Sequence, residues 1–263
     1  MAAKRPKLGQ HFLTSDTYRR RIAESLSIRP NDLVIEIGPG DGAMTGLLAE
    51  RAAHVVAVEL DSGLAASLAM KLAGIANVEV VRADILETDL GEICRRHDRA
   101  AAYVFGNLPY YITSPILHHL LEAPERIRAM ACVVQVEVAG RITARPGTRD
   151  YGYLSVLAQL HSVPQLRFRI PPGAFSPPPA VVSALITFEM LTQRPVPDDS
   201  RQGFLDFAKH CFAYKRKTLA NNLAARYGAD RVRGELRVLG IKETARAEEL
   251  PVIDLARLFD KLI

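Results

Sequence analysis

The sequence predicts a mostly parallel α/β domain followed by a small all-helical domain. Short apolar runs alternate with helical patterns through most of the chain, as in βαβ units. A Pro- and Asp-rich stretch at 193–199 then precedes a purely helical pattern. With 263 residues, 48% of them hydrophobic and 24% charged, the chain is long enough for one large and one small globular domain. We therefore expect domains at 1–195, beginning with a basic arm and helix over 1–30, and at 196–263.

The expected strands are short runs of apolar and β-branched residues that end at glycine or polar residues. In chain order they are 33–37, 54–60, 78–82, 103–106, 130–136 and 182–188. The helical patterns between them span 43–51, 64–72, 115–121 and 137–144. Ser114 and Pro115 suit the N-cap and first position of the third helix. The segment 153–161 fits a helix or a strand, and further helices are expected around 204–212, 230–239 and 245–262.

Composition points to a protein of the cytoplasm. No apolar run approaches the roughly 20 residues needed to cross a bilayer, and residues 1–8 are basic without the apolar core of a secretory signal. The three cysteines, Cys94, Cys132 and Cys211, are odd in number and far apart. This spacing suits neither a disulfide framework nor a metal site, so a reducing compartment is expected.

The positive charge of the chain lies in its two flanks. Residues 1–30 hold seven Lys and Arg against two acids, and residues 200–263 hold thirteen against eight. The net charge of the whole chain is +5, so the stretch between the flanks is acidic. Nucleic-acid phosphates are the natural partner of such flanks, although charge that serves only solubility is the alternative.

A glycine-rich loop, Glu36-Ile37-Gly38-Pro39-Gly40-Asp41-Gly42, follows the first expected strand of the sheet. Its glycines allow sharp turns and a close approach of a ligand. Pro39 lacks an N–H that a pyrophosphate would use, and the Glu36 carboxylate would repel a diphosphate. The same carboxylate tolerates a cationic methionine group, which favours S-adenosylmethionine over NAD.

Acidic residues end the next two expected strands. Glu59 lies twenty-one residues after Gly38, the spacing at which a carboxylate accepts hydrogen bonds from ribose hydroxyls. Asp84 follows the third strand, where it can accept from the amino group of an adenine. Each acid alone could be a solvated strand end or a helix cap. Together with Gly38 and Asn107 at neighbouring strand ends, they predict one adenosine-type cofactor site.

Asn107-Leu108-Pro109-Tyr110 follows the fourth strand and suits chemistry on an exocyclic amino group. The lone pair of such a nitrogen is delocalised into the base, so it is a poor nucleophile. The Asn107 oxygen and the carbonyl of Leu108 or Pro109 can hold both of its N–H bonds and favour a tetrahedral nitrogen. Pro109 stiffens the turn, and Tyr110 offers a surface on which a base can stack. An ordinary strand-ending turn is the alternative.

On these motifs the chain closely resembles the small-subunit ribosomal RNA dimethyladenosine transferases, the ribosomal RNA small subunit methyltransferase A family, which have a Rossmann-like sheet with helices on both faces. The matching blocks cover nearly the whole chain. They are Gly9–Leu13, Glu36–Gly42, Glu59–Asp61, Asp84, Gly106–Tyr110, Phe175–Pro179 with Val181 and Ser183, and Phe212–Leu223. Two positions depart from the family pattern: His11, where many relatives have Asn, and Tyr153, where basic residues are frequent.

The resemblance implies transfer of two methyl groups from S-adenosylmethionine to N6 of each of two adjacent adenosines near the 3′ end of 16S rRNA. It assigns cofactor contacts to His11, Leu13, Gly38, Gly40, Glu59, Asp84 and Asn107. It also implies that Phe175 stacks on the flipped adenine opposite Tyr110, with core packing as the alternative role for Phe175. The reaction is expected to be a direct SN2 transfer without a metal or a dedicated general base.

The basic flanks are then expected to hold the RNA of a small-subunit assembly intermediate. The candidate RNA contacts are Lys4, Arg5, Lys7, Lys215, Arg216 and Lys217. We expect a monomer. Three alternatives stay open: methylation of an adenine in 23S rRNA, a non-catalytic ribosome assembly factor, and an NAD-dependent oxidoreductase.

Overall fold

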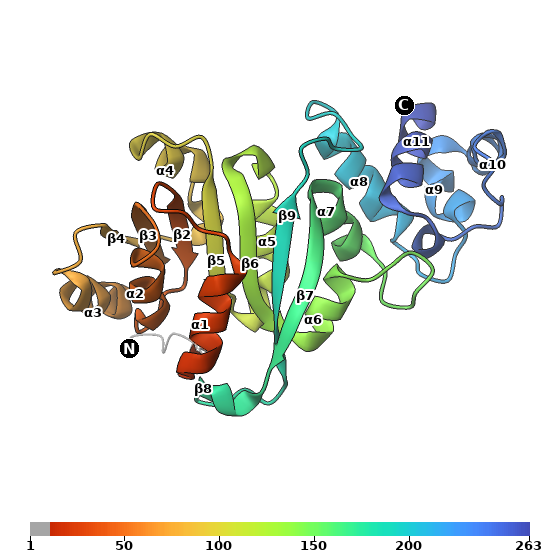
Figure 1. Cartoon of the computed structure of the whole chain (residues 1–263). Coiled ribbons are helices and arrows are strands. Elements are labelled where there is room, and N and C mark those ends of the chain that lie inside the picture. Colours follow the sequence, from red (N-terminus) through yellow and green to blue (C-terminus); the bar gives the residue numbers. More distant parts are fainter. Residues whose placement is uncertain (1–10) are drawn as a thin grey trace, which may run out of the picture. The chain divides into compact units, whose positions relative to one another are not determined.

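The computed structural model describes residues 11–263 (Figure 1), and these form two compact units. The first consists of the described residues up to Ala139 together with Gln165–Met190, and the second of Gly140–Pro164 with Leu191–Ile263. The chain passes from the first unit into the second for the last time after Met190, close to the boundary expected at 195. The helical unit also takes 140–164, which the sequence placed in the first domain.

A seven-stranded sheet forms the centre of the first unit. Its strands are β2 (Leu33–Ile37), β3 (His54–Glu59), β4 (Val78–Arg82), β5 (Ala102–Asn107), β6 (Ile127–Gln135), β7 (Ser162–Ile170) and β9 (Ser183–Met190). The order across the sheet is β4-β3-β2-β5-β6-β9-β7. Neighbours from β4 to β6 are parallel, whereas β9 runs antiparallel to β6.

This order creates a topological switch point beside β2. The chain moves outward from β2 through β3 to β4 and then returns to the other side of β2 as β5. The connections after β2 and β5 therefore lead away from each other, and ligands of open α/β sheets bind in the crevice that results. The glycine loop follows β2, and Asn107 is the last residue of β5.

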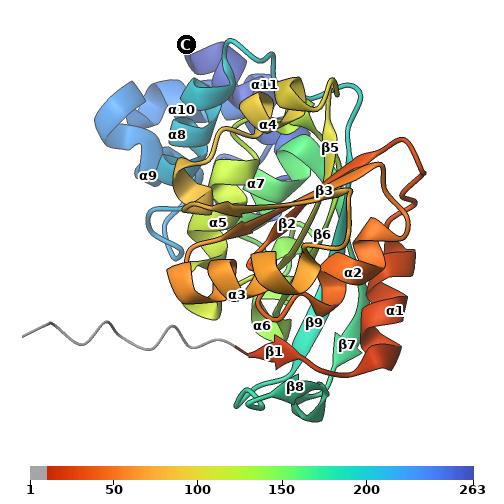
Figure 2. The same ribbon diagram turned by 90° about the vertical axis from the view of Figure 1, so that its left-hand side faces the viewer.

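Helices cover both faces of the sheet (Figure 2). The helices that begin in this unit are α1 (Asp16–Ser25), α2 (Ala43–Ala49), α3 (Ser62–Leu72), α4 (Leu90–Arg96), α5 (Thr113–Leu120) and α6 (Val136–Ile142), with short 3₁₀ turns η1 (Ile85–Glu87), η2 (Tyr110–Ile112), η3 (Pro124–Arg126) and η4 (Pro172–Ala174). Figure 2 shows α1 and α2 on one side of the sheet and α5 on the other. Ile22 of α1 and Leu48 of α2 are fully buried in one apolar cluster with Phe105 of β5.

The strands expected from the sequence all form, with ends shifted by a few residues, but β7 was missed. Five of its nine residues are exposed, including Arg167 and Arg169, and it contains Pro164. Such a composition belongs to a sheet edge, where a missing N–H costs little and charges discourage pairing with other chains. The start of α5 was also wrong, because the helix begins at Thr113 and Ser114 lies inside its first turn.

A two-stranded sheet brings the two ends of the first unit together. β1 (Phe12–Leu13) pairs antiparallel with β8 (Phe175–Ser176), so that Leu13 lies opposite Phe175. The Thr14 N–H also donates to the Ala174 carbonyl over 2.8 Å. The N-terminal motif is thereby held against the Pro-rich segment that precedes β9.

The second unit is helical. It contains α7 (Tyr153–His161), α8 (Arg201–Cys211), α9 (Leu219–Tyr227), α10 (Ala229–Val238) and α11 (Val252–Leu262), with the 3₁₀ turn η5 (Ala247–Glu249). The ambiguous segment 153–161 is thus a helix. Phe259 packs against Phe204 and Phe207 with ring centroids 5.6 and 5.5 Å away, which forms the aromatic core of the unit. No helix among residues 11–263 is long and apolar enough to cross a membrane.

Candidate active site

The glycine loop after β2 borders a group of cavities at the carboxyl ends of the strands. Gly38 has φ +62°, a left-handed conformation, and a side chain there would point into open space. Gly40 has φ +56°, and a Cβ would lie only 2.6 Å from the Phe12 ring. The backbone at Gly38 is therefore open to a ligand, whereas Gly40 lets the N-terminal segment close against the loop.

One cavity has the composition expected of an adenosine pocket. Apolar side chains and two acids line it: Ile37, Val58, Leu60, Ile85, Pro109, Tyr111, Ile112, Ile116, Glu59 and Asp84. A mostly apolar lining with two carboxylates suits a flat base joined to a ribose.

Glu59 and Asp84 are both fixed by backbone N–H groups. Glu59 is 2% exposed, and its two oxygens accept from Asp61 N–H at 3.0 Å and from Gly40 N–H at 3.4 Å. Asp84 caps the turn η1 by accepting from Leu86 N–H at 2.9 Å. The cap role considered for Asp84 is therefore present, and its carboxylate lines the cavity at the same time.

A neighbouring cavity is lined by Leu13, Glu36, Asp41 and Asn107. Glu36 is 1% exposed, and burial raises the pKa of its carboxyl to about 7. Its Oε2 atom has no hydrogen-bond partner in the described structure. A buried carboxylate oxygen without a partner costs free energy, and a cationic ligand group in the cavity would offset that cost. The residues present therefore fit the ammonium-bearing methionine part of S-adenosylmethionine.

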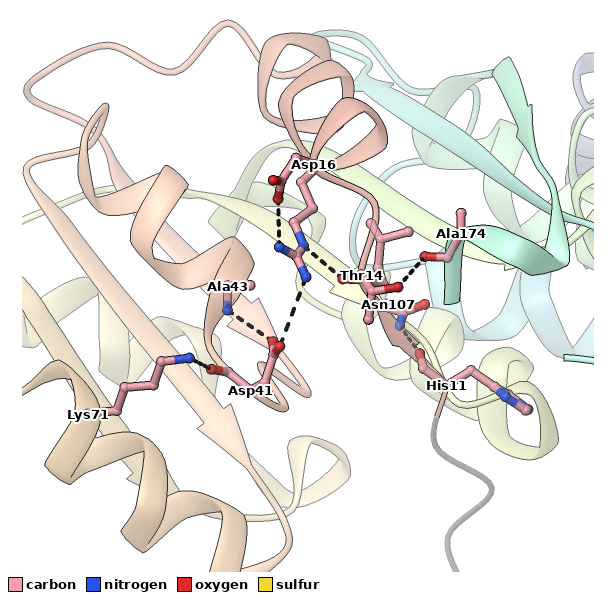
Figure 3. Close-up of polar contacts among 10 residues, drawn as sticks. His11, Thr14, Asp16, Asp41, Ala43, Lys71, Asn107 and Ala174 are labelled. Carbon is pink, nitrogen blue, oxygen red and sulfur yellow. Dashed lines mark hydrogen bonds and ion pairs between the residues drawn. The ribbon is translucent and has the colours of Figure 1, made fainter. Parts of the chain in front are cut away.

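The orientation of the Asn107 amide is set by the N-terminal segment. Its Nδ2 donates to the His11 carbonyl over 2.8 Å (Figure 3). Because the nitrogen must face that carbonyl, the side-chain oxygen is left to accept hydrogen bonds from a ligand. Asn107 lines the cavity that contains Glu36 and another that contains Tyr110, so it lies where donor and acceptor groups would meet.

Leu108 and Pro109 contribute differently to the turn. Leu108 is 1% exposed, and its N–H donates to the Val133 carbonyl of the adjacent strand. The Pro109 carbonyl accepts from Ile112 N–H at 3.2 Å and from Thr113 Oγ1 at 3.0 Å. A carbonyl oxygen has two lone pairs, so that of Pro109 is fully used within the protein.

The Tyr110 ring is held at its edge and on its face. Its hydroxyl lies 2.6 Å from Oγ of Ser183, which is fully buried at the start of β9. The His11 ring stacks on Tyr110 with centroids 5.7 Å apart and an angle of 27° between the planes. His11 Nδ1 in turn lies 2.8 Å from the Pro177 carbonyl. Sequence reasoning missed the contact between Tyr110 and Ser183, which joins positions 73 residues apart.

Arg19 of α1 links the N-terminal segment to the glycine loop. Its Nε donates to the Leu13 carbonyl over 2.7 Å, and its guanidinium pairs with Asp16 at 2.9 Å and approaches Asp41 to 4.0 Å. The Asp41 carbonyl also accepts from Lys71 Nζ at 2.7 Å (Figure 3). Sequence reasoning missed Arg19, because nothing in its local pattern distinguishes it from Arg20 and Arg21.

Phe175 occupies a core position. Its ring is 3% exposed and belongs to the apolar cluster that includes Leu13 and Phe105. It does not line the cavity that contains Tyr110. The core-packing alternative suits this position, and stacking of Phe175 on the adenine stays a prediction.

The expected RNA contacts fall into two groups. Lys4, Arg5 and Lys7 lie outside the described residues. Lys215, Arg216 and Lys217 are exposed and lie in the turn between α8 and α9. Over the described part of the chain, no cluster of three or more His, Cys, Asp or Glu side chains could hold a metal ion.

A mostly parallel sheet with a glycine loop after β2 and carboxylates after β3 and β4 defines the protein as a Rossmann-like methyltransferase that uses S-adenosylmethionine. The family model described as ribosomal RNA adenine dimethylase matches residues 1–263. The chain belongs to this family. It is therefore an rRNA adenine dimethyltransferase, and S-adenosylmethionine is its methyl donor.

Individual relatives agree with this assignment. The chain is 44% identical to a ribosomal RNA small subunit methyltransferase A of Acidobacterium capsulatum, over 98% of this chain and 91% of that protein. It is 40% identical to the enzyme of the same name from Koribacter versatilis, over 99% and 95%. The crystal structure of the 23S rRNA methyltransferase ErmE superposes with a TM-score of 0.74 at 30% identity, covering 95% of this chain and 99% of that one. The crystal structure of a dimethyladenosine transferase from Plasmodium falciparum superposes with a TM-score of 0.76 at 20% identity, covering 94% of this chain and 96% of that one. The two proteins share the fold.

Proposed function

We propose that the enzyme dimethylates N6 of two adjacent adenosines near the 3′ end of 16S rRNA during assembly of the small ribosomal subunit. The observation that carries the chemistry is the Asn107 amide, whose nitrogen is bound to the His11 carbonyl. Its oxygen is then free to accept from the adenine amino group. The relatives named for the small subunit, at 40–44% identity, support the choice of rRNA.

The second acceptor for the amino group is the Leu108 carbonyl. The sequence left Leu108 and Pro109 open, but the Pro109 carbonyl already accepts two hydrogen bonds. With one N–H bound to Asn107 and the other to Leu108, the lone pair of N6 is directed away from both residues. The expected roles of Gly38, Glu59 and Asp84 in cofactor binding are part of this proposal.

The target adenine must leave its stack to reach Asn107, and Tyr110 receives it there. S-adenosylmethionine supplies a sulfonium methyl group that needs no further activation. N6 attacks the methyl carbon as the bond from that carbon to sulfur breaks, and the bonding pair stays on sulfur. The amino proton, acidic once N6 carries the new methyl group, passes to solvent. Positioning by the turn provides the acceleration.

A second candidate is methylation of 23S rRNA, which the similarity to ErmE favours. The deciding experiment is transfer of labelled methyl groups to under-methylated small subunits, to naked 16S rRNA and to 23S rRNA, with the modified positions located by primer extension. The proposal expects labelling of two adjacent 16S adenosines. Labelling of 23S rRNA alone would contradict it.

We also propose that the enzyme acts as a cytoplasmic monomer on an assembly intermediate. Its three cysteines are buried free thiols, which suits a reducing compartment. Light scattering of the purified protein would test the monomer, and the comparison of subunits with naked rRNA would test the preference for an intermediate.

A further inference from the structure

Two connections of the helical unit together present five exposed cations. One connection joins α6 to α7, and the other joins α8 to α9. Lys215 Nζ donates to the Arg149 carbonyl over 2.6 Å, so the two connections lie against each other. The exposed cations are Arg145, Arg149, Lys215, Arg216 and Lys217. We refer to this set as the two-loop basic surface.

The cations of this surface lack acidic partners, whereas Arg233 and Arg237 of the same unit have them. Arg233 pairs with Asp230 at 2.7 Å, and Arg237 pairs with Glu243 at 2.7 Å. Among the residues that the structure describes, no carboxylate lies within 4.0 Å of the charged groups of the five cations. Asp150 is the acid in the same connection as Arg149 and is also exposed. The surface therefore keeps a net charge of +4 for an anionic partner.

Tyr214 presents an aromatic ring within this surface. It is 60% exposed, whereas large apolar side chains in the unit are mostly buried. Its carbonyl accepts from Lys217 N–H at 3.0 Å and from Asn222 Nδ2 at 3.2 Å, so its backbone is fixed. The Lys217 ammonium lies 4.2 Å from the ring centroid. An exposed ring on a fixed backbone, beside cations without acidic partners, suits single-stranded nucleic acid.

We propose that the two-loop basic surface binds an unpaired segment of RNA, with one base stacked on Tyr214 and the flanking phosphates at the cations. This inference rests on the proposed function, which supplies rRNA as the ligand. It adds Tyr214, Arg145 and Arg149 to the three cations expected from the sequence. All of its residues belong to the helical unit, whereas Asn107 belongs to the first unit.

The chemistry favours an unpaired strand over a duplex. In a double helix the base faces are covered by their neighbours, so a duplex could use only the cations. In a single strand the faces are free, and stacking on an aromatic ring is tolerant of sequence. An acidic protein surface would also satisfy the cations, but it would leave the Tyr214 ring without a matching flat group.

The chain contains no tryptophan, so a Tyr214→Trp protein carries a single indole at the proposed contact. Its fluorescence would be titrated with an oligoadenylate and with an abasic oligonucleotide of the same length and charge. The matched control is Val238→Trp, at a position on α10 that is 71% exposed in the same unit. We expect the oligoadenylate, but not the abasic strand, to quench the fluorescence of Tyr214→Trp. Neither strand should quench the fluorescence of Val238→Trp.

Affinity measurements complete the test. Tyr214→Ala should weaken binding of the oligoadenylate roughly 5- to 150-fold and Tyr214→Phe much less. Lys215→Gln should lower the slope of log affinity against log salt by about 0.7. Equal quenching by the abasic strand, or equal quenching of the control protein, would overturn the stacking contact. Methyl transfer by the same Tyr214→Trp protein is measured in parallel, so that failure of stacking with active enzyme is distinguished from failure of the proposed function.

Discussion

The Tyr110 hydroxyl and the Ser183 hydroxyl lie 2.6 Å apart and join the turn after β5 to the first residue of β9. Ser183 is fixed in register opposite Gln135 of β6, so it is a rigid anchor. Burial also raises the pKa of Tyr110, and the phenol therefore stays protonated and available for this bond. A stacking ring whose edge is held in this way keeps one plane when a base arrives.

Removing either hydroxyl should slow methyl transfer without weakening cofactor binding. We expect Tyr110→Phe and Ser183→Ala each to lower kcat about 10-fold, the equivalent of one hydrogen bond, and the double variant to be no slower than the singles. Single-turnover methyl transfer and titration with S-adenosylmethionine would measure the two quantities. Tyr103→Phe is the control. The Tyr103 hydroxyl donates to the Ser27 carbonyl over 3.1 Å and does not take part in the site. Additive losses in the double variant would contradict a shared role.

The common location of the strand-end residues could be predicted, because parallel strands bring their carboxyl ends to one edge of the sheet. Gly38, Glu59, Asp84 and Asn107 lie far apart in the sequence, and the sheet order brings all four to the same group of cavities. Local patterns were enough for this, since each residue follows a recognisable apolar strand.

Contacts that depend on tertiary packing could not be predicted. The bond from Ser183 to Tyr110 and the bond from Arg19 to the Leu13 carbonyl require the final positions of β9 and α1. The core position of Phe175 follows from the pairing of β8 with β1, two strands of only two residues each. Strands this short have no detectable periodicity.

Asn107→Ala should lower kcat by roughly 10²- to 10³-fold, the cost of removing one group that is positioned for the transition state. Cofactor affinity should change far less, because Glu59 and Asp84 remain. Asn107→Asp is the informative companion. It keeps an oxygen toward the amino group but places another against the His11 carbonyl, which now lacks its donor. We expect Asn107→Asp to be slow as well, and methyl transfer by Asn107→Ala at the rate of the unaltered enzyme would disprove the assignment.

Arg19→Ala should weaken binding of S-adenosylmethionine roughly 10-fold, because a charged hydrogen bond to the Leu13 carbonyl is lost. The side chain of Arg19 is 14% exposed, so the bond is partly shielded from water. Calorimetric titration with the cofactor would measure the change. Arg19 also forms an (i, i+3) ion pair with Asp16, so the control is Arg233→Ala, which removes the (i, i+3) pair with Asp230 on α10. This control should leave the affinity for the cofactor unchanged. Equal losses in both variants would show that helix stability, and not the link to the loop, is responsible.

Glu36 should make cofactor binding depend on pH. In the protein without cofactor, burial raises the pKa of Glu36 to about 7, so near neutral pH much of it is protonated. A cationic ligand favours the carboxylate, so binding below pH 7 should release a proton. Affinity should then rise up to about 10-fold per pH unit below pH 7 and level off above it. Glu36→Gln should show a flatter profile, and titrations in buffers of different ionisation enthalpy would measure the released proton.

The same group should affect the stability of the cofactor-free protein with the opposite sign. Its pKa is higher in the folded chain than the value of 4.5 for a free side chain, so the folded state binds the proton more tightly. The free energy of unfolding should therefore fall as pH rises from about 4.5 to about 7, by an amount on the order of 3 kcal/mol. Glu36→Gln should remove this decrease, which denaturant titration at several pH values would measure. If the free energy of unfolding falls equally with pH in Glu36→Gln, the decrease belongs to other groups. In the binding experiment, a pH-independent affinity of the unaltered protein would show that the cofactor does not approach the carboxylate.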